Sequence, residues 1–519
     1  MEVKMEKFDI GKDIERLLNY ASKENLLEEL DIIYARNSLL ELLEVDEPAR
    51  ISEEDTHSLV EILNRILNYA YQKGIIKENS VTYRDLFDTK IMNIVIKRPQ
   101  DIVNRFYKDT KEAGIKVATD KFYKMSIASN YIRMDRINKN LYWETDTEFG
   151  ALEITINLSK PEKDPKDIAA SKLLAATKYP KCLLCLENLG FSGTLNHPSR
   201  HNLRVIPIKI QGEAWYFQYS PYVYYNEHCI VFYNEHTPMK LSYKTFEKLF
   251  DFIDQFPHYF IGSNADLPIV GGSILAHEHF QGGRHVFPIE GAIIEKSFQH
   301  PLYENVNCGI VNWPMSVIRL SSRDRKLLTS SCNLLYESWK NYSDASRDIL
   351  PTTLENAKLI SHNTVTPIAR LNKDGLYEMD IVLRNNRANQ EFPDGIFHPH
   401  KELHHIKKEN IGLIEVMGLA ILPERLKNEL REVKDILQGR NSINNVTADT
   451  NIYKHLDWIN YLINKFGVNI KDQEVEDIIN REVGLKFLQV LENAGVYKRD
   501  ENGKNGIKEF ILSCGFKEV

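Results

Sequence analysis

The most informative stretch of the chain is Gly271-Gly-Ser-Ile-Leu-Ala-His-Glu-His-Phe-Gln-Gly-Gly283, in which glycine pairs bracket a short apolar segment. If this segment is a strand, its period of two places His277, His279 and Gln281 on one face and Phe280 on the other. Two imidazoles and an amide on one face can bind a metal, or can attack and hold a phosphoryl group. Glycines suit the second role because backbone N–H groups can then approach phosphate oxygens closely. The alternative interpretation is a pair of hydrogen-bonded structural histidines.

The residues around the motif have the pattern of an antiparallel sheet. Leu152, Ile154 and Ile156 alternate with polar residues, which predicts a half-buried strand over residues 151–159. Further strands or apolar runs are expected over residues 215–225, 229–233, 365–371, 377–384 and 412–422. The turn Asn372-Lys-Asp-Gly375 predicts a hairpin between two of them. Strands lead to a His-rich segment near residue 277 and again near residue 400, which suggests a duplication.

Both ends of the chain are predicted to be helical. Apolar residues recur at helical spacing through residues 1 to about 115, and again through the last hundred residues or so. Pro423 is suited to open one of the C-terminal helices and Gly439 to close it. The sequence therefore predicts an α+β fold, with an antiparallel core of about 270 residues between two helical flanks.

The composition narrows the classes of function. Of 519 residues, 43% are hydrophobic and 27% are charged, as in an ordinary soluble globular protein. The net charge of −7 gives no support to nucleic-acid binding. No stretch approaches the roughly 18–20 apolar residues of a membrane span, so no membrane role is expected. Six cysteines are too few for a disulfide scaffold, which favours a reducing, cytoplasmic location.

A second motif, Cys182-Leu-Leu-Cys185, has the spacing of half a zinc site. A redox pair at this spacing would usually open a helix, whereas the residues that follow have the composition of a loop. Two buried core cysteines are the remaining alternative.

The motifs together resemble those of a known family. His277-Glu-His-Phe-Gln281 resembles the His-x-His-x-Gln motif of the galactose-1-phosphate uridylyltransferases, a branch of the histidine-triad superfamily. Three more segments resemble the family in the same order: Cys182 to Asn188, Asn234 to Pro238, and Ile411 to Arg425. The segment His398 to His405 fits the longer, second type of this enzyme found in bacteria. With the helical flanks included, the resemblance covers nearly the whole chain.

The resemblance implies both a fold and an activity. The fold is a histidine-triad-like antiparallel core of half-barrel type, duplicated, with helical flanks. The implied division is residues 1–145 helical, 146–300 the catalytic half, 301–425 the second half of the transferase core, and 426–519 helical. The implied activity exchanges UMP between UDP-glucose and galactose 1-phosphate by a ping-pong mechanism through a uridylyl-histidine.

Roles for individual residues also follow from the resemblance. His279 would be the nucleophile, and Gln281 would donate to a phosphoryl oxygen. A structural zinc would be held by Cys182, Cys185, His236 and His277, and no organic cofactor is implied. The expected substrate contacts are Arg284, Asn157 and Ser273.

Several alternatives stay open at this stage. The same His279 would serve a histidine-triad hydrolase or phosphorylase that uses water or phosphate as acceptor. A metal-dependent hydrolase would use His277 and His279 as ligands of a catalytic zinc, and a non-catalytic protein would only bind sugar nucleotides. The cluster of His398, His400, His404 and His405 suits a second metal, a sugar contact or an ordinary surface equally well. The resemblance also implies a homodimer.

Overall fold

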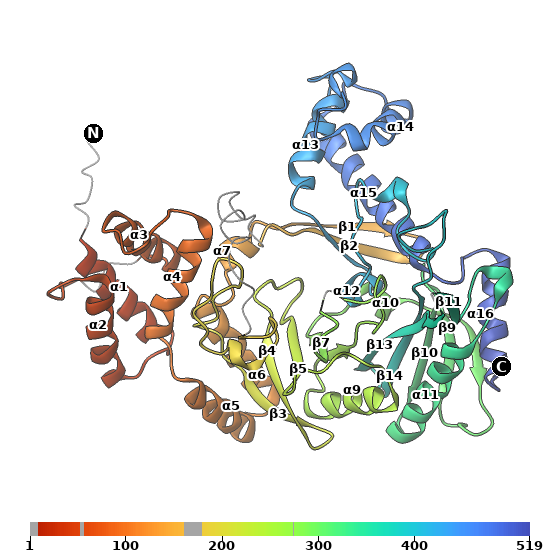
Figure 1. Ribbon diagram of the computed structural model, residues 1–519, viewed down its shortest axis with the longest axis horizontal. Coiled ribbons are helices and arrows are strands. Elements are labelled where there is room, and N and C mark those ends of the chain that lie inside the picture. Colours follow the sequence, from red (N-terminus) through yellow and green to blue (C-terminus); the bar gives the residue numbers. More distant parts are fainter. Residues whose placement is uncertain (1–8, 52–56, 160–178, 273, 356) are drawn as a thin grey trace.

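The computed structural model describes residues 9–51, 57–159, 179–272, 274–355 and 357–519 (Figure 1). Ser273 therefore lies outside the described residues. The N-terminal helices lie at one end of the molecule, the large sheet occupies the centre, and the helices α13 to α15 stand above it. Within the described ranges, no helix is both long enough and apolar enough to cross a membrane.

The N-terminal region is helical, as the sequence predicts. Its helices are α1 (Ile10–Lys23), α2 (Glu29–Leu43), α3 (Leu59–Gln72), α4 (Val81–Ile94), α5 (Pro99–Ala113), α6 (Ile115–Ala128) and α7 (Met134–Ile137). Local signals set their starts: Ser58 and Glu61 form a reciprocal capping box, and Pro99 opens α5 where its missing N–H has no consequence. The apolar faces of α1 to α4 pack into a cluster of their own, around residues such as Ile14 and Ile66.

The centre is an 11-stranded sheet in the order β16-β8-β9-β10-β14-β13-β6-β7-β5-β4-β3, with antiparallel pairing between neighbours. The strands are β3 (Ile206–Ile210), β4 (Glu213–Tyr219), β5 (Cys229–Tyr233), β6 (Phe260–Gly262), β7 (His279–Gly283), β8 (Ile294–Gln299), β9 (Asn307–Val311), β10 (Val317–Ser322), β13 (Asn363–Leu371), β14 (Tyr377–Asn385) and β16 (Lys517–Glu518). The helices α9 (Tyr243–Gln255) and α11 (Arg325–Asn341) contribute Phe246 and Leu335 to the same buried cluster as Phe280 of β7.

The order of the strands confirms the expected duplication. The first half has the order β3-β4-β5-β7-β6, with α9 between β5 and β6 along the chain. The second half has the order β8-β9-β10-β14-β13, with α11 between β10 and β13. The halves meet where β6 pairs with β13, at Gly262 and Ile368. Because Gly262 is also paired with Gln281 and Ile368 with Asp380, Asp380 in the second half occupies the place of Gln281 in the first.

The expectation that the repeated segment lies near residue 400 was wrong. The second-half counterpart of β7 is β14, which contains no histidine. The His-rich segment near residue 400 follows β14 and lies outside the sheet, around the short helix η3 (Lys401–Leu403). Histidine content alone could not distinguish a repeated strand from a loop that follows it.

A smaller sheet joins β1 (Leu141–Thr147), β2 (Gly150–Ile156) and β15 (Leu419–Leu422), with β15 parallel to β2. The expectation that β2 is half-buried was wrong, because its polar face is buried as well. Glu153 is 9% exposed and contacts His285 at 2.8 Å, and Asn157 just beyond the strand is also 9% exposed. Alternation in the sequence identified the strand, but could not show that protein covers both faces.

The remaining helices and strands lie outside these two sheets. The remaining elements are α10 (Pro288–Gly291), β11 (Thr352–Glu355), β12 (Lys358–Ser361), α12 (Leu413–Val416), α13 (Leu426–Leu437), α14 (Leu456–Phe466), α15 (Asp472–Ala494), α16 (Glu501–Ser513) and the short helices η1 (Leu186–Asn188), η2 (Ala345–Arg347), η4 (Ile443–Asn445) and η5 (Tyr453–His455). The apolar run 412–422 is α12 followed by β15 rather than one strand, with the turn between them at Gly418 (φ +105°). The helices α13 to α15 pack with the small sheet into a second large cluster, whereas α16 packs into the cluster of the large sheet.

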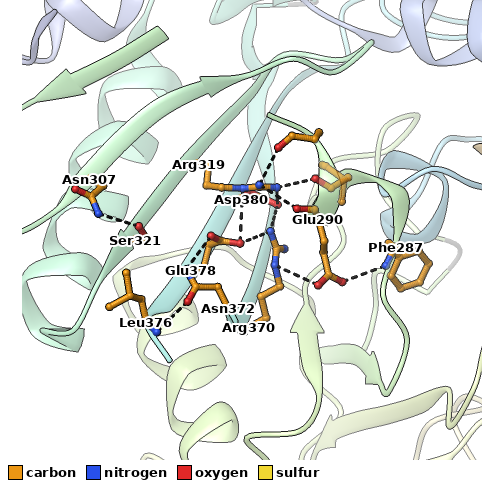
Figure 2. A network of polar contacts seen from close by, with 12 residues as sticks. Phe287, Glu290, Asn307, Arg319, Ser321, Arg370, Asn372, Leu376, Glu378 and Asp380 are labelled. Atoms are coloured by element: carbon orange, nitrogen blue, oxygen red, sulfur yellow. Dashed lines mark hydrogen bonds and ion pairs between the residues drawn. The ribbon is translucent and has the colours of Figure 1, made fainter. Parts of the chain in front are cut away.

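The second half of the sheet contains a buried ionic network on the face that corresponds to the motif face of β7 (Figure 2). Both oxygens of Asp380 accept hydrogen bonds from Arg319, at 2.6 and 2.9 Å, and one also accepts from Arg370 at 2.7 Å. Glu378 contacts Arg370 at 2.5 Å, and Glu290 lies 3.6 Å from the same guanidinium. Burial alone would raise the pKa of Asp380, but the two arginines hold it below its usual value.

Removing one charge from this network should strongly destabilise the protein. We expect Asp380→Asn to lower the free energy of unfolding by about 3–5 kcal/mol, because it removes the carboxylate that both buried arginines share and leaves only Glu378 and Glu290 beside them. The control is Glu337→Gln, which breaks an exposed pair with Lys340 and should change stability by less than about 0.5 kcal/mol. Denaturant unfolding measures both changes, and a loss below about 1 kcal/mol for Asp380→Asn would contradict the prediction.

Candidate active site and metal cluster

The strand β7 lies between β5 and β6 in the first half-sheet and presents His279 and Gln281 on the same face. The register pairs His279 with Phe232 and Gln281 with Ile230 of β5. Phe280 points to the other side, into the helix-covered core, where its ring stacks on Trp215 with centroids 5.1 Å apart. The strand begins only at His279, so His277 precedes it and does not share its face by strand geometry. This differs from the expectation that one strand carries all three polar residues.

His277 belongs instead to a cluster with the two cysteines of the Cys-x-x-Cys motif. Cys182 Sγ lies 3.5 Å from Cys185 Sγ and 3.3 Å from His277 Nδ1. Cys185 Sγ lies 3.2 Å from His236 Nδ1 and 3.7 Å from His277 Nδ1. The structure thus brings together the four residues that the resemblance implies.

This donor set fits a tetrahedral metal ion. The four ligand atoms lie within 4.8 Å of one another, and within the described ranges no other group of three or more His, Cys, Asp or Glu side chains does so. With Zn–S bonds of about 2.3 Å and Zn–N bonds of about 2.0 Å, a tetrahedron places its donors about 3.5–3.8 Å apart. The separations of 3.2–3.7 Å in the cluster are close to these values. The arrangement is therefore compatible with zinc.

His277 also orients His279. Its Nε2 lies 2.8 Å from the carbonyl oxygen of Tyr233, which leaves Nδ1 facing the cysteines. The carbonyl oxygen of His277 lies 2.8 Å from Nδ1 of His279, so this nitrogen carries the proton and donates it. The lone pair of His279 is therefore on Nε2. Burial lowers the pKa of His279 to about 4, which keeps the ring neutral at neutral pH.

Gln281 is held by a residue that the sequence analysis missed. His228 immediately precedes β5, and its Nε2 is 3.1 Å from Oε1 of Gln281. Burial lowers the pKa of His228 to about 4, and its Nδ1 has no partner among the described residues. Because an orphaned buried N–H is rarer than an orphaned acceptor, the proton of this neutral ring is on Nε2 and is donated to Gln281. The amide N–H₂ of Gln281 is then free for another acceptor. No local pattern in the sequence marks His228.

The second half lacks this chemistry. Asp380 occupies the place of Gln281, and Glu378 occupies that of His279. Both carboxylates are engaged by Arg319 and Arg370, so the second half has a sealed ionic network where the first has a neutral imidazole.

A large cavity of about 1280 Å³ opens beside the metal cluster. Its walls are formed by α4, residues 130–136, the loop 194–202, two tyrosines after β4, and residues 274–276 just before the motif histidines. Cys182 and Asn157 also line it, whereas the buried His279 and the half-buried Gln281 are not among its lining residues.

The three expected substrate contacts have different surroundings. Asn157 lines the cavity, as its proposed role requires. Arg284 does not line it, because its Nη2 is paired with Asp120 at 2.8 Å and with Glu227. Its charge is therefore already compensated inside the protein, which disfavours a phosphate contact. Ser273 lies outside the described residues.

The four histidines near residue 400 do not converge on one point. His400 stacks on Phe392 with centroids 4.2 Å apart, and His404 Nε2 lies 2.8 Å from the carbonyl oxygen of Pro399. His405 Nδ1 lies 2.7 Å from Nδ1 of His455, far along the chain. His398 and His405 are buried rather than at the surface. In the part of the chain that the structure describes, this segment forms no metal cluster.

Comparisons with known proteins give a consistent result. The profile of the galactose-1-phosphate uridyl transferase N-terminal domain matches residues 25–238, and that of the C-terminal domain matches residues 251–449. A galactose-1-phosphate uridylyltransferase of Caldanaerobacter subterraneus subsp. tengcongensis is 58% identical over 98% of this chain and 99% of that protein. Proteins of the same name from Clostridium acetobutylicum and Bacillus subtilis are 51% and 47% identical, over 97% and 98% of this chain and 99% of each protein.

Among solved structures, the yeast Ap4A phosphorylase Apa2 matches with a TM-score of 0.31 and 12% identity, over 64% of this chain and 89% of that chain. This similarity is too weak to bear on fold or function.

Proposed function

The chain belongs to the galactose-1-phosphate uridylyltransferase family and is a transferase of galactose metabolism, and we propose that it transfers UMP from UDP-glucose to galactose 1-phosphate through a uridylyl-histidine at His279. The observation that carries the proposal is the 2.8 Å hydrogen bond from Nδ1 of His279 to the carbonyl of His277. It leaves a neutral imidazole with its lone pair on Nε2, which is the form a nucleophile needs.

The proposed reaction has two displacements at the same phosphorus. In the first, Nε2 of His279 attacks the α-phosphorus of UDP-glucose, and the bond from phosphorus to the bridging oxygen breaks. The electron pair leaves with glucose 1-phosphate, which is a stable anion and needs no strong general acid. In the second, a phosphate oxygen of galactose 1-phosphate attacks the same phosphorus and the N–P bond breaks, which gives UDP-galactose and restores His279.

Gln281 has the role of an electrostatic stabiliser in this proposal. His228 holds its carbonyl oxygen, so its amide N–H₂ is available to donate to a non-bridging oxygen of the transferred phosphoryl group. A neutral amide adds neither a competing nucleophile nor a charge that would repel the phosphate. The carboxylates at the equivalent positions of the second half are engaged by arginines and offer neither a nucleophile nor a free donor, which supports placing the reaction in the first half.

The metal has a structural role in this proposal. Cys182, Cys185, His236 and His277 would hold one zinc ion, which when bound stabilises the thiolates and ties three distant segments together. The cluster supplies four protein donors, so it leaves no open position for water, and His279 is not among them. The alternative of a metal-dependent hydrolase with His277 and His279 as ligands is therefore disfavoured. The implied homodimer stays a prediction.

The nucleophile can be tested by trapping. Incubation of the protein with UDP-glucose labelled in its α-phosphate should leave an acid-labile, base-stable label on His279. His279→Ala should abolish the label and lower exchange activity by at least about 10³-fold. The control His400→Ala removes the last histidine of the other His-x-His sequence and should label normally. A label on another residue, or full exchange by His279→Ala, would refute the proposed intermediate.

The coupling of His228 to Gln281 can be tested by a double-mutant cycle. Gln281→Ala and His228→Ala should each lower kcat by about 10²-fold, because each removes or misplaces the same amide donor. The double variant should then be no slower than Gln281→Ala alone, since the two side chains act as one unit. Steady-state kinetics with both substrates measure kcat for each variant. Losses that multiply in the double variant would show that the residues act independently.

The metal can be tested by elemental analysis and unfolding. We expect about one zinc ion per chain, and Cys185→Ala should lose it and unfold at lower temperature. Cys514→Ala, which changes a thiol outside the cluster, should keep the metal. Chelation should reduce activity slowly and in parallel with thermal stability. A metal-free wild-type protein, or instant loss of turnover with unchanged stability, would argue against a structural zinc.

A further inference from the structure

The N-terminal helical region forms one wall of the cavity, and the loop 193–202 is bound to it. Thr89 Oγ1 of α4 lies 2.6 Å from Ser199 Oγ, and Asn202 Nδ2 donates to the carbonyl of Ser129 at 3.0 Å. Gly193 packs so closely on α4 that an added Cβ would lie 2.6 Å from Leu86 Cδ2. This loop is therefore held in place by the helices rather than by the sheet.

The loop contributes a cation that no described residue compensates. Four basic side chains line the cavity, and three of them are paired: Arg133 with Asp88, Arg136 with Asp85, and Lys407 with Glu415. The fourth is Arg200, whose guanidinium has no hydrogen-bond or ion-pair partner among the described residues. It lies over the ring of Tyr131, 5.8 Å from the centroid.

Two buried donors that line the same cavity also have no partner among the residues that the structure describes. Tyr131 is 6% exposed, and its hydroxyl has no hydrogen-bond partner in the described part of the chain. Asn157 is 9% exposed; its Oδ1 accepts from the N–H and the hydroxyl of Ser159, while its Nδ2 has no partner there. Buried polar groups without a hydrogen-bond partner are unfavourable and rare, so such groups call for a specific explanation.

We infer that Arg200, Tyr131 and Asn157 form a phosphate-ester subsite of the cavity, and thus that the N-terminal helical region takes part directly in substrate binding. The inference rests on the proposed function for the identity of the ligand. All three groups can donate a hydrogen bond, and the one carbonyl oxygen among them, Oδ1 of Asn157, is already occupied by Ser159. Burial raises the pKa of Tyr131 to about 12, so its phenol stays protonated and able to donate.

Two phosphate esters among the substrates fit this chemistry. One is the phosphate of the hexose 1-phosphate, and the other is the α-phosphate of the uridine nucleotide. Direct binding of glucose 1-phosphate and of UMP by calorimetry, on the full-length protein, distinguishes them and needs no turnover. We expect glucose 1-phosphate to be the ester that depends on Arg200.

The first test removes the cation. Arg200→Gln should weaken binding of glucose 1-phosphate by about 10- to 100-fold, as expected for loss of a charge-assisted hydrogen bond. The matched control is Arg136→Gln, which removes the same charge from the same cavity but from a side chain held by Asp85. It should lower thermal stability and change both affinities by less than about two-fold. Equal effects of the two variants would overturn the inference, because they would indicate only a long-range effect of charge.

The second test separates binding from folding by the direction of the change. Tyr131→Phe removes only the unpartnered hydroxyl, so the melting temperature should stay the same or rise. If the hydroxyl binds a phosphate ester, affinity for that ester should fall by about 3- to 10-fold in the same variant. Unchanged affinity for both esters in Tyr131→Phe and Arg200→Gln would overturn the subsite.

The binding measurements and the assay of UMP exchange can succeed or fail separately. If the wild-type protein binds glucose 1-phosphate through Arg200 but exchanges no UMP, the subsite stands and the proposed function fails. If UMP is exchanged normally while neither variant loses affinity, the proposed function stands and the subsite fails.

Discussion

The hydrogen bond between the main chain of His277 and the ring of His279 links the two chemistries of this protein. The side chain of His277 belongs to the Cys/His cluster, and its carbonyl oxygen accepts the proton on Nδ1 of His279. The contacts that fix the position of His277 therefore also fix the carbonyl oxygen to which the ring of His279 donates. Because the carbonyl belongs to the backbone, the orientation does not depend on a second mobile side chain.

The two halves of the duplicated sheet carry different residues at equivalent positions. In the first half, the face of β7 carries neutral groups, with His279 and Gln281 supported by His228. In the second half, the equivalent positions of β14 carry carboxylates that are neutralised by arginines. Buried carboxylates require such compensation, and once compensated they have no capacity left to act on a substrate. The same topology thus gives a chemically open face in one half and a closed ionic network in the other.

The N-terminal helices have a position that their sequence does not suggest. Their apolar stripes predict only a packed cluster, and such a cluster is present in α1 to α4. The structure adds that α4 and residues 130–136 form a wall of the cavity and hold the loop that carries Arg200. A region without any recognisable motif is in this way brought next to residues 274–276, which lead into the motif histidines.

The sequence by itself determined the α+β class, the helical flanks, the hairpin between β13 and β14, and the identity of the motif residues, because these depend on local periodicity, turn residues and short spacings. It also indicated the Cys/His set, though only through the resemblance, since no spacing rule connects His236 to Cys182. Other features were decided only by the tertiary structure: the burial of the polar face of β2, the pairing of Arg284 with acidic groups, and the contact of His228 with Gln281. The physical reason is that burial and hydrogen-bond partners depend on segments far apart in the chain, and a one-dimensional pattern carries no information about which of them meet.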